Sequence, residues 1–409
     1  MKFIRLLTTS TSVVSGALLT SMLMTCCATP QPSKTEIAVH QIDSLFTLRY
    51  STGTTLQDSA FTNPGGAVLI MKGDTLLFDK GYGIADTETG AKIDGNTFFN
   101  IASVSKQFAA TAILKLYQEG KLDIHKSIYD IHPDVNPYLP KPRKPFTDIT
   151  VQHLLSHASG IPDNRPRDNR EFTLTATDME SIAYLKDIDS LNFAPGTQYE
   201  YMNPTFQLLY VMIEKVSGKS FEQYMREEIF TPAGMPEAIY FEVDRTIPRM
   251  AHGYVPNAEI TPDTPEKAKH FKQYDYGEET FFATKADGGL YTSTHEFAAW
   301  EKALRNNLIL SKVIKEEAHS AVNSISGSTY SSYQNRPYTS YGYGWFIEEA
   351  PNMPQKVYHT GDNGGFQIYA GRFPCKNLLI LVFENRNDHD RWSMVQKLDK
   401  IAKNAGWLE

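Results

Sequence analysis

The sequence predicts a mixed α/β fold of the α+β type, in which an antiparallel sheet is flanked by helices and a further lobe is entirely helical. Two observations carry this prediction. Strand-like apolar runs occur near both ends of the chain, whereas the middle is dominated by apolar residues at helical spacing. Because sheet edges must be paired or covered, we expect the early and late strands to join in one sheet.

The early elements are predicted to be a helix, a hairpin and a second helix. Residues 37–50 carry apolar side chains at a mostly helical spacing, which predicts an amphipathic helix. Two apolar runs, 67–71 and 75–78, flank a Lys-Gly-Asp turn and predict an antiparallel hairpin. Residues 107–119 predict a buried helix, since Gly120 follows where a helix-ending glycine belongs.

The remaining elements divide into a helical middle and a strand-rich end. Helical patterns recur between Pro-rich or Gly-rich breaks at residues 151–156, 204–216, 221–229 and 295–305. Strand patterns follow at residues 344–347, 356–360, 367–373 and 378–383, and a helical run at 393–402 closes the chain. This order predicts one catalytic domain over residues 37–409, with its helical lobe at roughly residues 98–340.

The charge and cysteine content argue against two classes of protein. Forty Lys and Arg residues against 47 Asp and Glu residues give a formal net charge of −7, which argues against a basic surface for nucleic acid. Three cysteines are too few for a disulfide-stapled fold. No motif indicates a metal or another cofactor.

The first 25 residues have the pattern of an export signal. Lys2 and Arg5 precede an uncharged stretch with an apolar centre that ends at Cys26. A membrane-spanning helix is the alternative, but Thr and Ser residues dilute the run. Residues 23–26 resemble a bacterial lipoprotein cleavage site, which implies Cys26 as a lipid anchor and residues 26–36 as a tether. We therefore expect an exported protein, lipid-anchored at the bacterial cell envelope.

The first chemical motif is Ser103-Val104-Ser105-Lys106, at the start of the predicted buried helix. Residues three positions apart share one helical face, so the Lys106 amine can reach the Ser103 hydroxyl. A neutral lysine can accept the serine proton if burial or cationic neighbours lower its pKa from about 10.4. A helix N-terminus also favours an oxyanion. Ser103 and Lys106 are therefore a candidate nucleophile and base.

The second motif is Tyr201-Met202-Asn203, directly before the helix predicted at 204–216. A tyrosine hydroxyl can relay a proton, and an asparagine amide can hold a lysine or a substrate amide. Another Tyr-x-Asn occurs at residues 333–335, in a Ser- and Tyr-rich stretch without a turn-to-helix context, where a loop is the alternative interpretation. We choose Tyr201 as the candidate.

The third motif is His359-Thr360-Gly361, followed by Asp362, at the end of a strand-like run. A strand edge exposes backbone N–H groups for an oxyanion, and glycine lets a substrate approach the backbone closely. His359 is a candidate for proton transfer or for carboxylate binding. The alternative is a strand-end histidine whose ring is satisfied by a carbonyl group.

These motifs together resemble the serine beta-lactamase and penicillin-binding-protein superfamily, in its class C-like and esterase-like branch. The order Ser-x-x-Lys, Tyr-x-Asn, His-x-Gly is similar in identity and in chain order, and residues 149–160, 195–197 and 288–291 resemble the family as well. The resemblance implies an antiparallel sheet flanked by helices, with a helical lobe.

The resemblance also implies a role for each motif residue. Ser103 would be the acyl-accepting nucleophile, Lys106 and Tyr201 the proton-transfer pair, and Asn203 a positioning amide. The backbone N–H groups of Ser103 and Asp362 would form the oxyanion hole, and His359, Thr360 and Gly361 would contact the substrate.

One departure from the family concerns the substrate. Members that hydrolyse lactams usually carry Lys where this chain has His359, and a neutral imidazole offers no permanent charge to an antibiotic carboxylate. The resemblance therefore implies a serine hydrolase that forms an acyl-enzyme from an ester or amide, like an esterase or a D-amino-acid peptidase, with weak lactamase activity at most. The expected partner is then a small-molecule or peptide acyl donor. The alternative is an envelope penicillin-binding or peptidoglycan-sensing protein that acylates without efficient turnover.

Overall fold

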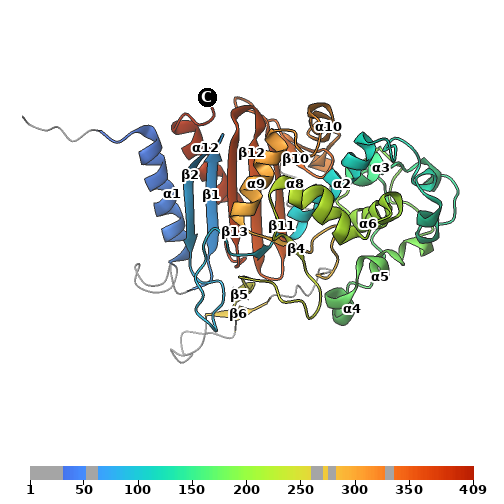
Figure 1. Cartoon of the computed structure of the whole chain (residues 1–409), viewed down its shortest axis with the longest axis horizontal. Helices are drawn as coiled ribbons and strands as arrows, with labels where there is room; N and C mark the ends of the chain where they lie inside the picture. The colour runs from blue at the N-terminus through green and yellow to red at the C-terminus, as the bar shows by residue number, and fades with distance from the viewer. Residues whose placement is uncertain (1–30, 52–62, 259–269, 275–281, 328–335) are drawn as a thin grey trace, which may run out of the picture.

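The computed structural model describes residues 31–51, 63–258, 270–274, 282–327 and 336–409 (Figure 1). Its largest sheet consists of eight strands: β1 (Gly66–Lys72), β2 (Thr75–Tyr82), β8 (Asn323–Ser324), β9 (Thr339–Tyr341), β10 (Phe346–Glu348), β11 (Lys356–Asn363), β12 (Phe366–Phe373) and β13 (Leu378–Glu384). They lie in the order β2-β1-β13-β12-β11-β10-β9-β8, and every neighbouring pair is antiparallel.

The two ends of the chain meet in this sheet, as the sequence predicts. Ile70 of β1 lies opposite Phe78 of β2 on one side and opposite Ile380 of β13 on the other. β13 is buried along its whole length, and alternate residues enter two different cores. Leu381 faces one core and Val382 the other, which explains the continuous apolar run of this strand.

Helices cover both faces of the sheet. On one face, α1 (Lys34–Tyr50) packs beside α12 (Arg391–Asn404), and α1 buries Ala38, Ile42 and Phe46, which recur every four residues on one side of the helix. On the other face, α9 (Thr294–Arg305) packs against β1 and β13. Figure 1 shows α1 at the outer end of the molecule, beside β2.

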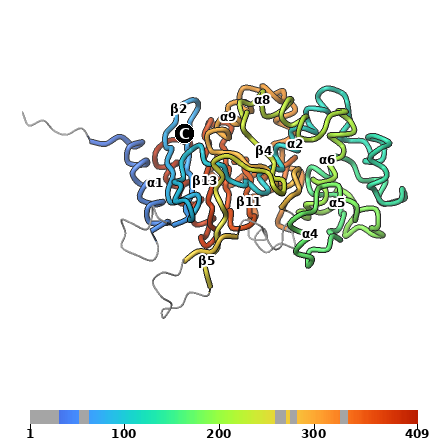
Figure 2. The backbone as a smooth tube through the Cα atoms, turned by 60° about the horizontal axis from the view of Figure 1, so that its bottom comes forward, coloured from blue at the N-terminus to red at the C-terminus, as the bar shows by residue number. Residues whose placement is uncertain are grey.

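Most of the other described helices form a lobe beyond the other end of the sheet, which Figure 2 shows from a second direction. The α-helices of the described residues not yet given are α2 (Lys106–Gln118), α3 (Val151–Leu155), α4 (Arg170–Thr175), α5 (Asp178–Ile182), α6 (Asn203–Ser217), α7 (Phe221–Tyr224), α8 (Thr231–Ala233), which packs against α9, and α10 (Lys312–Ala318). Two small sheets complete the fold, β3 (Phe99–Asn100), β7 (Leu290–Thr292) and β4 (Ile239–Tyr240) in one, and β5 (Tyr254–Pro256) and β6 (Phe271–Gln273) in the other.

The structure corrects some of the predicted boundaries. The helix predicted at 221–229 is α-helical only over α7 and continues as a π-helical turn over Met225–Phe230. The short helices α4 and α5 lie mostly in a stretch without a helical prediction, because neither reaches two full turns and their apolar period is too short to detect. β8 and the start of β9 belong to the main sheet although they lie inside the range predicted for the helical lobe, roughly 98–340.

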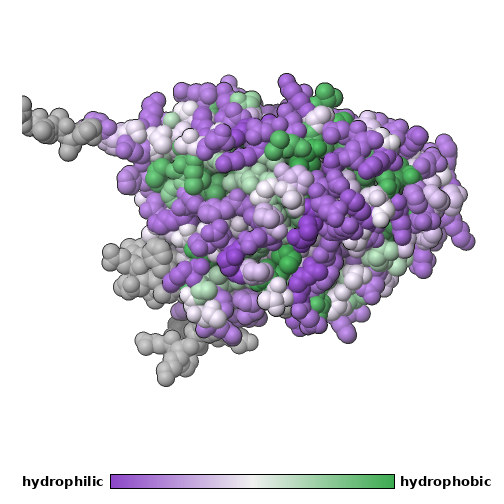
Figure 3. Space-filling view, viewed as in Figure 1, coloured by the Kyte–Doolittle hydropathy of each residue, from purple (hydrophilic) through white to green (hydrophobic). Residues whose placement is uncertain are grey.

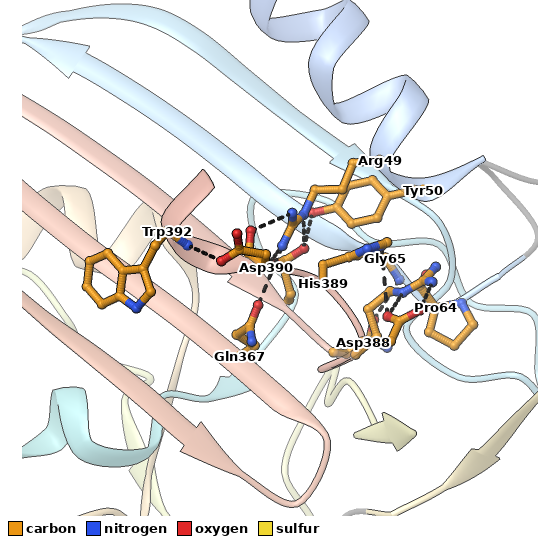
Figure 4. A network of polar contacts seen from close by, with 12 residues as sticks. Arg49, Tyr50, Pro64, Gly65, Gln367, Asp388, His389, Asp390 and Trp392 are labelled. Carbon is orange, nitrogen blue, oxygen red and sulfur yellow. Dashed lines mark hydrogen bonds and ion pairs between the residues drawn. The ribbon is translucent and has the colours of Figure 1, made fainter. Parts of the chain in front are cut away.

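A buried ion pair fixes α1 to the sheet (Figure 4). The guanidinium of Arg49 donates twice to the Glu384 carboxylate, from Nε at 2.7 Å and from Nη2 at 2.9 Å. The Tyr50 hydroxyl donates to the same carboxylate at 3.0 Å. This bidentate contact satisfies a carboxylate that is 1% exposed and orients the end of the helix on the sheet.

Hydrophilic residues cover most of the face shown in Figure 3, and apolar residues form only small patches between them. None of the described helices combines the length and the apolarity that crossing a membrane requires.

Candidate active site

The predicted nucleophile lies in a short, strained turn. Ser103 belongs to the 3-10 turn η2 (Ala102–Ser105), directly before α2, and it is the only residue of this turn that is not buried. Ala102 has a φ of +47°, a conformation that non-glycine residues seldom adopt and that clusters at functional sites. Asn100 stabilises it, since its Oδ1 accepts a hydrogen bond from the Ala102 N–H at 2.8 Å.

Lys106 is the first residue of α2, and its side chain is fully buried. Its Nζ donates to Ser103 Oγ at 3.1 Å and to the backbone carbonyl oxygen of Asp287 at 2.8 Å. Burial lowers the pKa of Lys106 to about 7; the charge of Asp287 opposes this shift and that of Arg165 adds to it. A neutral amine is therefore available beside Ser103 near neutral pH.

A chain of buried polar side chains connects Lys106 with the helical lobe. Arg165 Nη1 donates to Ser181 Oγ at 3.2 Å, and this hydroxyl donates to Gln207 Oε1 at 2.7 Å. Gln207 Nε2 then donates to Asp287 Oδ2 at 3.1 Å. The carboxylate of Asp287 is thus held in place by α6, while its backbone carbonyl oxygen orients the lysine. No sequence motif singled out these four residues.

The second motif lies against the first. Tyr201 lies two residues before α6 and is 9% exposed, and Lys106 Nζ lies 4.9 Å from the centroid of its ring. Asn203 is the first residue of α6, and its buried Oδ1 has no hydrogen-bond partner among the described residues. That oxygen can therefore accept a hydrogen bond from a substrate amide.

The third motif lies on β11, which packs against the nucleophile turn η2. β11 pairs with β12 as far as Asn363 but with β10 only as far as Tyr358, so the rest of its second edge faces η2. Gly361 lies so close to this turn that a Cβ there would approach the Ile101 carbonyl oxygen to 2.3 Å. Only glycine allows this approach, which brings this part of β11 against the turn that carries Ser103.

Both ring nitrogens of His359 are already engaged. Nδ1 donates to the Thr360 carbonyl oxygen at 2.7 Å, so Nε2 is the acceptor for the Tyr341 hydroxyl at 2.9 Å. Burial lowers the pKa of His359 to about 3, and the charge of Lys106 adds to this effect. The geometry therefore favours the alternative in which a carbonyl satisfies this histidine, and it leaves neither nitrogen for a substrate carboxylate.

Asp362 points away from the buried pair. Its carboxylate is 63% exposed and pairs with the guanidinium of Arg391, at the start of α12, which also donates to the Gly361 carbonyl oxygen at 3.3 Å. The side chain of Asp362 thus anchors the end of β11 to α12. The predicted export signal with Cys26 and the alternative Tyr-x-Asn at 333–335 lie outside the described residues.

Comparison with protein families gives one match that covers most of the chain: the model of the family described as Beta-lactamase matches residues 58–399. Among curated proteins, "Penicillin-binding protein 4*" of Bacillus subtilis (strain 168) is 27% identical over 338 residues, which cover 79% of this chain and 68% of that protein. "Protein flp" of Staphylococcus aureus (strain MW2) is 26% identical over 341 residues, which cover 82% of this chain and 62% of that protein. The match to these relatives thus spans only about two thirds of their length.

Solved structures share the fold. A penicillin-binding protein homologue from Pyrococcus abyssi, described as octameric, superimposes with a TM-score of 0.70 at 25% identity, covering 90% of this chain and 77% of the other. The D-amino acid amidase from Ochrobactrum anthropi SV3 gives a TM-score of 0.68 at 20% identity, covering 91% and 99%. EstCE1, a hydrolase described as having promiscuous acyltransferase activity, gives 0.67 at 16% identity, covering 90% and 98%.

Proposed function

The chain belongs to the beta-lactamase family of serine hydrolases, and from this premise we propose that it hydrolyses an ester or amide through an acyl-enzyme on Ser103. One observation carries the proposal: Lys106 Nζ is buried 3.1 Å from Ser103 Oγ with a pKa of about 7. A lysine in this state can act as a base at neutral pH, which an exposed lysine cannot.

Acylation begins with transfer of the Ser103 hydroxyl proton to the neutral amine of Lys106. Oγ forms a bond to the carbonyl carbon of the donor, and the carbonyl oxygen takes the negative charge beside the backbone N–H groups of Ser103 and Asp362. When the oxyanion collapses, the bond to the leaving group breaks. The leaving group takes the proton from Lys106 by way of the Tyr201 hydroxyl and departs as an alcohol or amine.

Deacylation repeats these steps with water as the nucleophile. Tyr201 and Lys106 accept a proton from the water as it attacks the acyl carbon, and they return it to Ser103 Oγ when the ester bond breaks. The products are a carboxylic acid and the free enzyme. Where the donor carries an amide N–H, Asn203 Oδ1 can accept a hydrogen bond from it during both steps.

The surroundings of His359 support a donor that needs no carboxylate next to the scissile bond. A neutral imidazole with both nitrogens engaged provides no charge for the carboxylate of a lactam antibiotic. Short esters and amides without this group fit better, and two of the structural neighbours are described as an amidase and as a hydrolase with acyltransferase activity. We therefore rank short esters and amides above lactams as substrates.

A substrate panel tests the proposal directly. The purified chain is assayed with a short-chain aryl ester, a D-amino-acid amide, a D-Ala-D-Ala peptide and a chromogenic cephalosporin, beside Ser103→Ala and the control Ser44→Ala on the exposed side of α1. We expect steady turnover of the ester or an amide, lost only in Ser103→Ala, together with labelling of Ser103 by a fluorophosphonate. Labelling that persists in Ser103→Ala would refute the assignment.

The second candidate function is acylation without turnover. The similarity to a curated protein named penicillin-binding protein supports this candidate. The stoichiometry of product release distinguishes a hydrolase from a protein that is acylated without turnover. One equivalent of product per enzyme followed by no further release indicates a binding or sensing protein, whereas continued release indicates a hydrolase.

A further inference from the structure

His157 is a buried and strained residue beside the candidate active site. It follows α3, is 1% exposed and has a φ of +55°, in the left-handed region that few residues other than glycine adopt. Such a conformation persists where surrounding contacts fix it. None of the three chemical motifs contains this residue.

His157 accepts two hydrogen bonds, one from each of the residues on either side of Tyr201. The backbone N–H of Glu200 donates to the His157 carbonyl oxygen at 2.9 Å. The backbone N–H of Met202 donates to His157 Nδ1 at 3.1 Å. A single residue therefore fixes the chain just before and just after the candidate proton-transfer tyrosine.

The imidazole ring of His157 also packs against the phenol ring of Tyr201. The two ring centroids are 4.2 Å apart and the ring planes are inclined by 40°. Because Nδ1 accepts a hydrogen bond from an N–H group, the neutral ring carries its hydrogen on Nε2. Burial lowers the pKa of His157 well below its usual value, and the charge of Lys106 in its protonated form adds to this. The ring therefore stays neutral and keeps Nδ1 as an acceptor.

The contact continues along both segments. The carbonyl oxygen of Ala158 accepts from the Gly196 N–H at 2.8 Å, and that of Gly160 accepts from the Asn192 N–H at 2.8 Å. Gly160 has a φ of +75°, and a Cβ there would lie 2.1 Å from the Phe193 carbonyl oxygen. The two segments are thus joined over several residues, and His157 is the end of this contact nearest Tyr201.

We propose that His157 is a positioning residue that holds the Tyr201 hydroxyl in place for proton transfer between Lys106 and the substrate. Its Nδ1 and carbonyl oxygen fix the backbone on both sides of the tyrosine, and its ring limits the tilt of the phenol. The inference rests on the proposed function, because it concerns the same reaction. It adds a residue that acts through Tyr201 and touches no reacting atom.

Two substitutions distinguish the role of His157 Nδ1 as a hydrogen-bond acceptor from the role of its ring in packing against Tyr201. His157→Phe keeps an aromatic ring but leaves the Met202 N–H buried without an acceptor. His157→Asn loses the ring but offers Oδ1 near the place of Nδ1, and asparagine also tolerates the left-handed backbone. We expect kcat for the best ester or amide to fall about 10- to 100-fold in His157→Phe with little change in KM, and His157→Asn to recover most of this loss.

A double-mutant cycle with Tyr201→Phe provides the decisive readout. If His157 acts through Tyr201, then His157→Phe should slow the Tyr201→Phe enzyme by no more than about twofold. An equal loss in both backgrounds, or equal losses in His157→Phe and His157→Asn, would overturn the inference. Unfolding in urea is measured for every variant, and His157→Ala replaces His157→Phe in the cycle if the latter does not fold.

The cycle also distinguishes this inference from the proposed function. If the Tyr201→Phe enzyme turns over substrate as fast as the parent enzyme, the assigned role of Tyr201 itself is contradicted. If the Tyr201→Phe enzyme is slow but the effects of His157→Phe and Tyr201→Phe on kcat are additive, only the role of His157 is contradicted.

Discussion

Lys106 Nζ donates to the backbone carbonyl oxygen of Asp287 at 2.8 Å, while the carboxylate of the same aspartate is held by Gln207 Nε2 at 3.1 Å. One residue therefore both orients the lysine and places a negative charge near it. Because this charge opposes the lowering of the Lys106 pKa by burial, Asp287 keeps that pKa near 7 rather than lower.

The first prediction concerns the pH dependence of catalysis. Since the base is neutral Lys106, kcat/KM should rise with pH through about 7 and then level off. In Asp287→Asn the opposing charge is gone, so the pKa of Lys106 falls and the rising limb of the kcat/KM profile moves to lower pH. The hydrogen bond from Gln207 can be kept, because the asparagine Oδ1 is also an acceptor. The exposed control Asp189→Asn should leave the limb in place. A limb that moves to higher pH in Asp287→Asn would contradict this account.

The second prediction concerns stability. The folded chain holds Lys106 with a lowered pKa of about 7, against 10.5 as its ordinary value, so between these pH values the unfolded chain binds more protons and stability rises with pH. Lys106→Met removes this dependence. The free energy of unfolding of Lys106→Met should exceed that of the parent most at pH 7 and below. This difference should shrink by about 1.4 kcal/mol per pH unit between pH 7 and the ordinary lysine pKa. Urea unfolding at several pH values measures it, with the exposed Lys141→Met as control.

Much of the fold follows from the sequence because its elements are long or strongly patterned. The hairpin of β1 and β2, the buried strand β13 and the helices α2 and α6 have unambiguous apolar periods, and their observed ends lie within a few residues of the predicted ones. Short elements such as α4, α5 and β7 could not be predicted. They contain too few residues to show a period, and tertiary contacts rather than local preference fix them.

Helix geometry predicts the contact between site residues only where they are close in sequence, whereas Tyr201, Asn203 and His359 are assigned to the same site through the resemblance to a family. Ser103 and Lys106 are three positions apart, so helix geometry alone brings them together. Asp287 and Gln207 reach Lys106 through tertiary contacts between segments far apart in the chain, and nothing local marks them. His359 carries a signal in its motif, but the engagement of both its nitrogens depends on Tyr341 of a neighbouring part of the sheet.

The third prediction concerns Tyr201. In Tyr201→Phe the ring still fills its place against His157, but the hydroxyl that relays the proton is lost. We expect kcat to fall about 100-fold or more, with KM changed by less than about threefold, because the lost interaction is needed mainly in the transition state. Steady-state kinetics with the best ester or amide measure both constants. Unchanged turnover would remove Tyr201 from the mechanism.

The fourth prediction concerns a lysine at the position of His359. His359→Lys would place an ammonium at a position that is 1% exposed, near the guanidinium of Arg391 and the amine of Lys106. Burial of an unpaired charge there should lower the free energy of unfolding by on the order of 3 kcal/mol, and hydrolysis of a chromogenic cephalosporin should not increase. His359→Gln, which adds no charge, is the control. A stable His359→Lys enzyme with new lactamase activity would contradict this prediction.

The last prediction uses two glycines that lie near the same turn. A Cβ on Gly361 would lie 2.3 Å from the Ile101 carbonyl oxygen and 3.0 Å from Ala102 Cβ, so Gly361→Ala must push β11 away from the nucleophile turn. Gly288 is the matched control, because a Cβ there would have Ala102 C at 3.9 Å as its nearest neighbour. We expect kcat/KM to fall at least about tenfold in Gly361→Ala and to change little in Gly288→Ala. Equal activities of the two variants would show that the distance between β11 and Ser103 does not limit catalysis.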